Sequence, residues 1–452
     1  MKFSSGLIIR LMKLAKAVTV FLITVMLMLA LMLLSSLIPQ RVISRHILES
    51  AEYMAKNDQF YCLINSMKST EVDHYADSLW LSIAYGLKPN FESVMWTSYY
   101  DDPMSLAHKD ILIQVEQNTP VNHEYLRYWH GATGIIRLLH VFLNVKESYI
   151  LFAVILTVLT IFLLCLLLRF HLWGEALAIL LSFFMTSMWI TPFCLEYIWC
   201  PIISLIASIV AVNLVLKEKY DRVPIFFMLI GMVTIYLDFL TTETLTLLIP
   251  LLLMLRVMRY HNFKGNEYCL KSKTENSIDK SSFWISFKVI VAWFAGYIGA
   301  WTMKWVLASM VLHQNVMPFV NSHISERING DVRGSISTYL YEAIVRNFRC
   351  LFFIEYGFPG QIITLLLLIV LIVAPVVRGS VKLKSNIKWS MIGLYALLGS
   401  VPFIRFLVLH NHAWNHYFFT YRALASSIVA ICFIWMELVE GAPIKPKGGM
   451  NE

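Results

Sequence analysis

Long apolar runs alternate with polar segments along the whole chain. A membrane-spanning helix needs about 20 consecutive apolar residues, and ten runs reach or approach this length. They lie at 17–38, 149–168, 174–193, 198–216, 224–240, 242–258, 284–312, 361–378, 389–409 and 417–438. The pattern predicts an all-α polytopic membrane protein with about ten transmembrane helices and a large first extracytoplasmic loop.

The polar segments between the runs define the expected domain organisation. The first run is too long for the apolar core of a signal peptide, so we expect it to be retained as the first helix. The run 224–258 must reverse near 238–243, because a single helix there would invert everything that follows. We expect helices at the membrane surface in 75–85, 124–146 and 335–348, where aromatic and apolar residues recur at helical spacing. The expected division is a cytoplasmic N-terminus at 1–16, the first helix at 17–38, the large extracytoplasmic loop at 39–148, helices two to six within 149–258, a solvated cytoplasmic loop at 259–283, helix seven at 284–312, a second extracytoplasmic segment at 313–360, helices eight to ten within 361–438, and a cytoplasmic tail at 439–452.

Composition supports the membrane assignment. Hydrophobic residues make up 58% of the chain and charged residues 15%, and the mean hydropathy is +0.65. Soluble domains average about 45–50% apolar and about 25% charged residues. The seven cysteines are scattered and show no paired spacing, which disfavours a disulfide framework. No phosphate-binding glycine loop, zinc-protease motif or nucleophile elbow is present in the sequence.

The distribution of charge predicts an orientation. The net charge is +8, and 20 of the 37 lysines and arginines fall in the segments expected inside the cell. The two large segments expected outside hold 13 basic and 17 acidic residues. By the positive-inside rule both termini are then cytoplasmic, in a multi-pass protein of the plasma membrane. This distribution assigns the basic residues to one side of a bilayer, so we expect no nucleic-acid partner.

Four carboxylates of the first outer loop are candidates for catalysis. Asp101 and Asp102 precede Pro103, and adjacent carboxylates there could hold a divalent metal ion such as Mg or Mn, or deprotonate an acceptor hydroxyl. The alternative is a solvated turn. Asp73 and Asp77 are spaced i, i+4 and share one face of the expected helix. The alternative for this pair is that one of them caps the helix.

Three further acidic residues are candidates for substrate binding. Asp238 and Glu243 lie within a long apolar run, where carboxylates are costly in lipid and usually face a cavity or a partner. Glu196 is expected at the same outer level. The alternative for Asp238 is that it caps the reversal of the chain. Lys304 lies near the outer end of the seventh run, where it could join a phosphate site or have no function.

The last outer turn gathers histidines and arginines. His410, His412 and His416 are spaced within seven residues, and Arg405 and Arg422 flank them. The spacing suits a zinc site poorly, because a tight turn rarely presents three imidazoles to one ion. Two guanidiniums suit a phosphate or diphosphate, so we expect Arg405, His412, His416 and Arg422 to bind substrate. Membrane anchoring at the interface is the alternative.

Four sequence strings carry a resemblance that covers most of the chain. They are Tyr-Ala-Asp-Ser at 75–78, Leu-Arg-Tyr-Trp-His-Gly at 126–131, Tyr-Leu-Asp-Phe-Leu-Thr-Thr-Glu at 236–243 and His-Tyr-Phe-Phe-Thr-Tyr-Arg at 416–422. The strings resemble a group of bacterial multi-spanning proteins, and the organisation resembles the membrane-embedded C-type glycosyltransferases. That superfamily implies a sugar donor on a polyprenyl phosphate and an acidic base or metal ligand in the first outer loop. The Asp-Glu pair usual there is absent, and Glu49 and Glu52 are an approximate substitute.

The expected function is therefore transfer of a sugar from a lipid-linked donor to a cell-envelope acceptor on the outer face. The expected partners are the lipid bilayer, a lipid-linked sugar donor, and a glycan or protein acceptor. Two alternatives stay open, a transporter or flippase of lipid-linked envelope glycans and a polymerase of such glycans.

Overall fold

The protein is mostly helical. The computed structural model describes residues 5–268, 275–328, 336–352, 354–377 and 381–441. Seven helical segments are long and apolar enough to cross a membrane by length and composition. They run over Leu11–Ser36, Val145–Arg169, Trp199–Leu216, Tyr220–Leu237, Ser281–Val311, Trp389–Val408 and Tyr417–Leu438. The chain is thus a membrane-embedded all-α protein.

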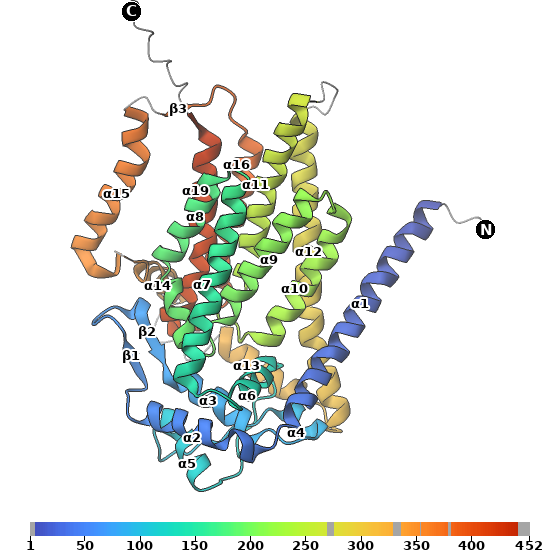
Figure 1. Cartoon of the computed structure of the whole chain (residues 1–452), viewed down its shortest axis with the longest axis vertical. Coiled ribbons are helices and arrows are strands. Elements are labelled where there is room, and N and C mark those ends of the chain that lie inside the picture. Colours follow the sequence, from blue (N-terminus) through green and yellow to red (C-terminus); the bar gives the residue numbers. More distant parts are fainter. Residues whose placement is uncertain (1–4, 269–274, 329–335, 353, 378–380, 442–452) are drawn as a thin grey trace, which may run out of the picture.

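The apolar helices among the described residues run roughly along the long axis of the molecule, and the first of them, at Ser5–Ser36, is oblique to it (Figure 1). They are α1 (Ser5–Ser36), α7 (Val145–Arg169), α8 (Trp173–Met185), α9 (Trp199–Leu216), α10 (Val223–Leu237), α11 (Leu245–Tyr268), α12 (Glu275–Val311), α15 (Gly357–Val377), α16 (Trp389–Val408) and α19 (Leu424–Leu438). Each overlaps one of the ten predicted runs. The predicted reversal near 238–243 is confirmed, because α10 ends at Leu237 and α11 begins at Leu245.

Two expectations about these helices need correction. The run 174–193 is not one helix, because α8 ends at Met185 and Ser187 takes a left-handed backbone conformation with φ of 47°. A 3₁₀ helix, η3 (Met188–Phe193), follows and contains Pro192, which cannot donate to an α-helical ladder. The expected solvated loop 259–283 is helical over most of its described part, because α11 continues to Tyr268 and α12 begins at Glu275.

The segment between α1 and α7 forms a cap at the end of the molecule opposite β3 (Val381–Leu383) (Figure 1). We call residues 37–144 the cap domain. It contains α2 (Gln40–Ala55), β1 (Phe60–Cys62), η1 (Lys68–Thr70), β2 (Glu71–Asp73), α3 (His74–Gly86), α4 (Phe91–Trp96), η2 (Ala107–Lys109), α5 (Asp110–Glu116) and α6 (Gly131–Leu139). The strands β1 and β2 pair antiparallel. The segment 75–85 is helical as predicted, in α3, but this helix is buried within the protein and does not lie at a membrane surface. In 124–146 only Gly131–Leu139 and the start of α7 are α-helical.

Buried side chains join the cap domain to the bundle. The Lys304 ammonium of α12 donates to the carbonyl oxygens of Met95 at 2.8 Å and Val94 at 3.3 Å, so it holds α4 rather than a phosphate. The Trp129 indole donates to the carbonyl oxygen of Ala300 at 2.8 Å. A buried ammonium bound to backbone oxygens fixes the cap domain against α12.

Most of the remaining elements follow α12 and precede α19 in the sequence. They are α13 (Met317–Ile328), α14 (Ile336–Arg349), η5 (Ile354–Tyr356), β3 (Val381–Leu383), α17 (His410–Asn415), α18 (Tyr417–Thr420), η6 (Tyr421–Ala423) and β4 (Val439–Gly441), with η4 (Tyr220–Arg222) before α10. The helix predicted at 335–348 is confirmed as α14. The predicted last outer turn is itself helical, as α17 and α18. The strands β3 and β4 pair antiparallel beside the C-terminal end of the chain.

An ion-pair network joins three helices at the end of the bundle opposite the cap domain. The Arg256 guanidinium of α11 contacts Glu175 of α8 at 2.8 Å and Glu437 of α19 at 2.6 Å. Arg259 contacts the same Glu437 at 2.9 Å. Glu437 is 1% exposed, so its charge is compensated within the protein. The network holds the ends of α8, α11 and α19 together.

Candidate functional site

The first turn of α3 holds two buried carboxylates that attach the cap domain to the bundle. Asp73 caps α3 by accepting from the Ala76 amide at 2.9 Å, and it accepts from the Tyr197 hydroxyl at 2.7 Å. Asp77 accepts from the Leu195 amide at 2.7 Å and from the Tyr149 hydroxyl of α7. The capping alternative is confirmed for Asp73.

These two carboxylates are inaccessible from outside. Asp73 is 4% exposed and Asp77 is 0% exposed. Burial raises the pKa of Asp73 to about 6 and that of Asp77 to about 7. A carboxyl group with a pKa near neutral pH suits acid–base catalysis. Asp73 and Asp77 are nevertheless buried too deeply for an acceptor sugar to reach them. Their contacts instead explain how α3 is fixed on α7 and on the segment after η3.

A second group of acidic and aromatic residues is accessible. The Tyr75 ring of α3 is 41% exposed, and Asp101 and Glu196 are both half-buried. Burial raises the pKa of Tyr75 to about 12, and the nearby Tyr125, Asp73, Glu196 and Asp101 add to this rise. Asp101 and Glu196 thus both act electrostatically on Tyr75, from segments that are far apart in the sequence.

Tyr99 and Tyr125 extend the same surface. The ring centroids of Tyr99 and Tyr125 lie 5.8 Å apart in an edge-to-face arrangement. Burial raises the pKa of Tyr99, and Tyr75 and Asp101 add to the rise. We call the set Tyr75, Tyr99, Asp101, Tyr125 and Glu196 the acidic tyrosine face. It combines four segments far apart in sequence: α3, the chain after α4, the chain before α6, and the chain between η3 and α9.

A cation borders the acidic tyrosine face. The Arg127 guanidinium lies over the Tyr125 ring at 4.8 Å and over the Tyr128 ring at 5.2 Å, and it donates to the Tyr125 hydroxyl at 3.0 Å. Trp301 of α12 donates to the Arg127 carbonyl at 2.6 Å. Arg127 is therefore held over the rings of Tyr125 and Tyr128. Sequence reasoning missed this residue, and its signal was the spacing of two tyrosines around an arginine at 125–128.

The structure separates Asp101 from its neighbour Asp102. The Asp102 carboxylate accepts from the Met104 amide at 3.0 Å, and its own amide donates to the Asp110 carboxylate at 3.4 Å. Asp102 thus belongs to the turn before α5, as the solvated-turn alternative predicts. Asp101 instead contributes to the raised pKa of Tyr75 and of Tyr99. Among the described residues no group of three or more histidine, cysteine, aspartate or glutamate side chains could hold a metal ion. The predicted Mg or Mn site at Asp101 and Asp102 therefore gains no third ligand of these types.

The reversal between α10 and α11 is held by its own carboxylates. Asp238 is 1% exposed and accepts from the Thr241 amide at 3.0 Å and from the Thr241 hydroxyl, which is the capping role. Glu243 accepts from two nitrogens of Arg405 at 2.6 and 2.9 Å. Phe239 stacks on Trp80 of α3 with ring centroids 4.1 Å apart. Asp238 therefore stabilises the reversal from within, Glu243 joins it to α16, and Phe239 packs it on the cap domain.

The two predicted phosphate-binding arginines have separate partners. Arg405 donates to Glu243 and to the Leu240 carbonyl at 2.6 Å. Arg422 is 1% exposed and donates to the Ser69 carbonyl of the cap domain at 3.1 Å. Among the residues that the structure describes, the two arginines contact none in common, so the expected convergence on one point gains no support. A guanidinium bound to Glu243 has little net charge to offer a phosphate.

His412 of α17 and His416, between α17 and α18, are linked to the buried carboxylate Asp73 through a chain of aromatic rings. The rings of His412 and His416 are 4.9 Å apart, and the Phe419 ring lies 5.8 and 5.3 Å from them. Phe419 contacts Tyr197 at 4.8 Å, and Tyr197 donates to Asp73. His412 is buried, whereas His416 is half-buried. This chain of rings connects α17 to the start of α3.

Comparison of the chain with protein-family models, with curated proteins and with solved structures found no match.

Proposed function

We propose that the chain is a membrane glycosyltransferase that moves a sugar from a polyprenyl-phosphate donor to a cell-envelope acceptor. The observation that carries the proposal is the acidic tyrosine face, where Asp101 and Glu196 lie on an accessible surface lined by three tyrosines. Carboxylates orient sugar hydroxyls by hydrogen bonds, and tyrosine rings provide apolar surface with a polar tip. The resemblance of the chain's organisation to the C-type glycosyltransferases agrees with this chemistry.

In the proposed reaction Asp101 is the general base. Its carboxylate takes the proton of an acceptor hydroxyl, and the acceptor oxygen forms a bond to the anomeric carbon of the donor sugar. The bond between that carbon and the donor phosphate oxygen breaks, and the phosphate leaves on its polyprenyl chain. Glu196 lies three residues before α9, and we assign it hydrogen bonds to the donor sugar. Arg127 compensates the charge that develops on the departing phosphate.

The proposed arrangement in the membrane has ten transmembrane helices. Both termini lie in the cytoplasm, the membrane is the plasma membrane, and the cap domain faces outward. The distribution of lysine and arginine supports this orientation. The ion pairs of Arg256 favour an enzyme over a flippase, because a flippase must part its helices at the inner face.

The test compares cell-surface glycans by mass spectrometry. A strain lacking the chain is complemented with wild type, Asp101→Asn, Glu196→Gln or the matched control Asp102→Asn, each at equal membrane abundance. We expect one sugar to be absent from the glycans of the Asp101→Asn and Glu196→Gln strains and present with Asp102→Asn. Accumulation of a complete lipid-linked unit would identify a flippase or polymerase instead. Wild-type glycans in all three variants would remove the acidic tyrosine face from the reaction.

A further inference from the structure

A small pocket opens in the cap domain beside α4, and we call it the cap pocket. Its walls come from the end of α3, from α4, from the chain on either side of α4, and from Val121. Its volume is about 210 Å³. This lies between the roughly 150 Å³ of a cavity that holds one benzene ring and the roughly 300–1,000 Å³ of pockets for drug-sized ligands. The cap pocket is therefore of the size of one six-membered ring with its substituents.

One wall of the cap pocket is aromatic. The Trp96 ring at the end of α4 is half-buried and lines the pocket. It makes an edge-to-face contact with Phe319 of α13, with the ring centroids 6.3 Å apart. This contact holds the indole in place, so that it presents an apolar surface together with a polar N–H group.

Polar side chains form the rim of the cap pocket. The Asn90 side-chain oxygen accepts from the Ser93 amide at 2.7 Å, and the Ser93 hydroxyl accepts from the Lys88 amide at 2.9 Å. These two bonds hold the rim in one conformation. The Lys88 and Glu92 side chains are exposed at the same rim, where an ammonium donates to hydroxyl groups and a carboxylate accepts from them.

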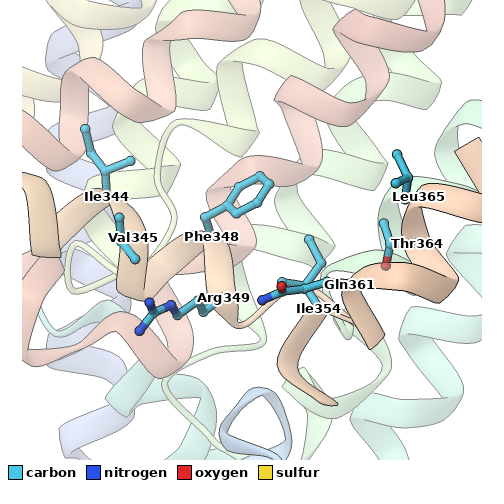
Figure 2. A pocket seen from close by; sticks show the side chains of 8 residues that line it. All are labelled: Ile344, Val345, Phe348, Arg349, Ile354, Gln361, Thr364 and Leu365. Atoms are coloured by element: carbon cyan, nitrogen blue, oxygen red, sulfur yellow. The ribbon is translucent and has the colours of Figure 1, made fainter. Parts of the chain in front are cut away.

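The cleft between α14 and α15, which Figure 2 shows, has a different surface. Its volume is about 440 Å³, and its walls are mostly apolar, with Ile344, Phe348 and Leu365 among them. Such walls offer few partners to a ligand that carries several hydroxyl groups. In the cap pocket polar and apolar atoms contribute comparably to the surface. A sugar matches this combination, because its ring carries both apolar C–H groups and hydroxyl groups.

The cap pocket adjoins the acidic tyrosine face. Ser98 lines the pocket and directly precedes Tyr99 of the face. On the neighbouring segment Val121 lines the pocket and directly precedes Asn122, whose side chain donates to the Asp101 carbonyl at 2.8 Å. Three residues of extended chain reach at most about 11 Å, so the Cα atoms of Ser98 and Asp101 lie within this distance. An oligosaccharide with one unit in the cap pocket can therefore present another unit at Asp101.

We propose that the cap pocket binds one sugar unit of the acceptor, which is then a glycan of several units. The inference rests on the proposed function, because it names the class of acceptor for the reaction at Asp101. Trp96 packs against the C–H face of the bound sugar, and Lys88, Asn90 and Glu92 bind its hydroxyl groups. A protein acceptor presents a single side-chain hydroxyl, which needs no ring-sized pocket beside the reacting group.

The experiment measures binding in the absence of any donor. Oligosaccharides are released by mild acid from the envelope of a strain that lacks the chain, where the unmodified acceptor should accumulate, and are labelled at the reducing end with a fluorophore. Binding to the full-length protein in nanodiscs is followed by fluorescence anisotropy. We expect these oligosaccharides to bind saturably. Tryptic peptides of envelope proteins from the same strain, labelled with the same fluorophore, should not bind.

Two matched pairs of variants test the position of the site. Glu92 and Glu116 are both exposed on short helices of the cap domain, and of the two Glu92 lines the pocket. We expect Glu92→Gln to raise the Kd about five-fold, because hydrogen bonds to a charged acceptor are stronger than those to an amide. Glu116→Gln should bind as wild type. Trp96→Ala should raise the Kd about ten-fold through loss of the aromatic wall, whereas Phe91→Ala, which removes an exposed ring of α4 outside the pocket, should not.

Three outcomes would overturn the inference. They are no saturable binding of the oligosaccharides by the wild type, equal Kd values for Glu92→Gln and Glu116→Gln, and binding of the peptides that Glu92→Gln weakens, which would indicate a protein acceptor. The assay requires neither the donor nor turnover. Binding that persists in a protein that transfers no sugar would therefore leave a glycan-binding site in a protein of another function. Sugar transfer without binding at the cap pocket would instead retain the proposed function and remove this inference.

Discussion

A close contact between α10 and α12 allows a quantitative prediction. A Cβ added at Gly296 of α12 would lie 2.0 Å from the Met228 carbonyl oxygen of α10, and one at Gly231 of α10 would lie 2.2 Å from the Trp293 carbonyl oxygen. Ordinary van der Waals contact begins at 3.4 Å. The two helices therefore approach through glycine on both sides, as small residues allow in membranes.

We predict that Gly296→Ala destabilises the protein. The added methyl overlaps a backbone oxygen that is fixed within α10, so the helices must separate by about 1.4 Å at this point, and overpacking of a core costs about 1–3 kcal/mol. Alanine recovers up to about 1 kcal/mol of helix propensity. The cost at a backbone contact falls at the upper end of the range, which leaves a net loss of about 2 kcal/mol.

The assay is thermal unfolding of detergent-solubilised protein, followed by intrinsic tryptophan fluorescence. Gly393 of α16 supplies the control, because a Cβ added there meets no atom within 4 Å. We expect Gly296→Ala to lower the unfolding temperature by several degrees and Gly393→Ala to leave it unchanged or raise it. Equal unfolding temperatures for the two variants would refute the close packing of α10 on α12.

Three further predictions concern buried charges and orientation. Because burial raises the pKa of Asp77 from the usual 3.8 to about 7, the folded chain binds a proton between these values that the unfolded chain releases. The stability that depends on Asp77 should fall as pH rises from about 4 to about 7. Asp77→Asn should remove this part of the pH dependence in the same unfolding assay. A wild-type stability that rises relative to the variant between these pH values would contradict the prediction. Glu243→Gln alone should lower the free energy of unfolding by about 3–5 kcal/mol, because it leaves the Arg405 guanidinium buried without its anion. Adding Arg405→Gln should recover part of this loss. Additive losses in the double variant would refute the pairing. Reporter fusions after Asn118 and after Asn276 should be active on opposite sides of the membrane, and activity on one side would refute the proposed topology.

The fold was predictable where one physical constraint dominates. Apolar runs of sufficient length form helices in lipid because backbone groups must bond within the segment. The reversal at 238–243 was predictable from two carboxylates in an apolar run. The break after α8 was not, because it depends on the left-handed conformation of Ser187 and on Pro192, which both lie within an apolar segment.

The candidate site was only partly predictable. The sequence identified Asp101 and Glu196 as separate candidates, but their common action on Tyr75 depends on the docking of the cap domain on the bundle. The sequence also favoured Asp73 and Asp77, whose spacing on one helical face gave no sign that Tyr197 and Tyr149 bury them. Pairing of buried charges over long sequence distances, as between Glu243 and Arg405, was likewise invisible without the fold.

The central claim is that Asp101 acts in sugar transfer from a polyprenyl phosphate. The most direct measurement follows a synthetic polyprenyl-phosphate monosaccharide, labelled in its sugar, with purified protein in nanodiscs and an extract of cell-envelope glycans as acceptor. We predict that the label leaves the lipid phase with wild type and with Asp102→Asn, and that the rate falls about 10²–10⁴-fold with Asp101→Asn, which is the contribution of a general base. A donor that stays intact with the wild-type protein, or is consumed at the same rate by Asp101→Asn, would contradict the account.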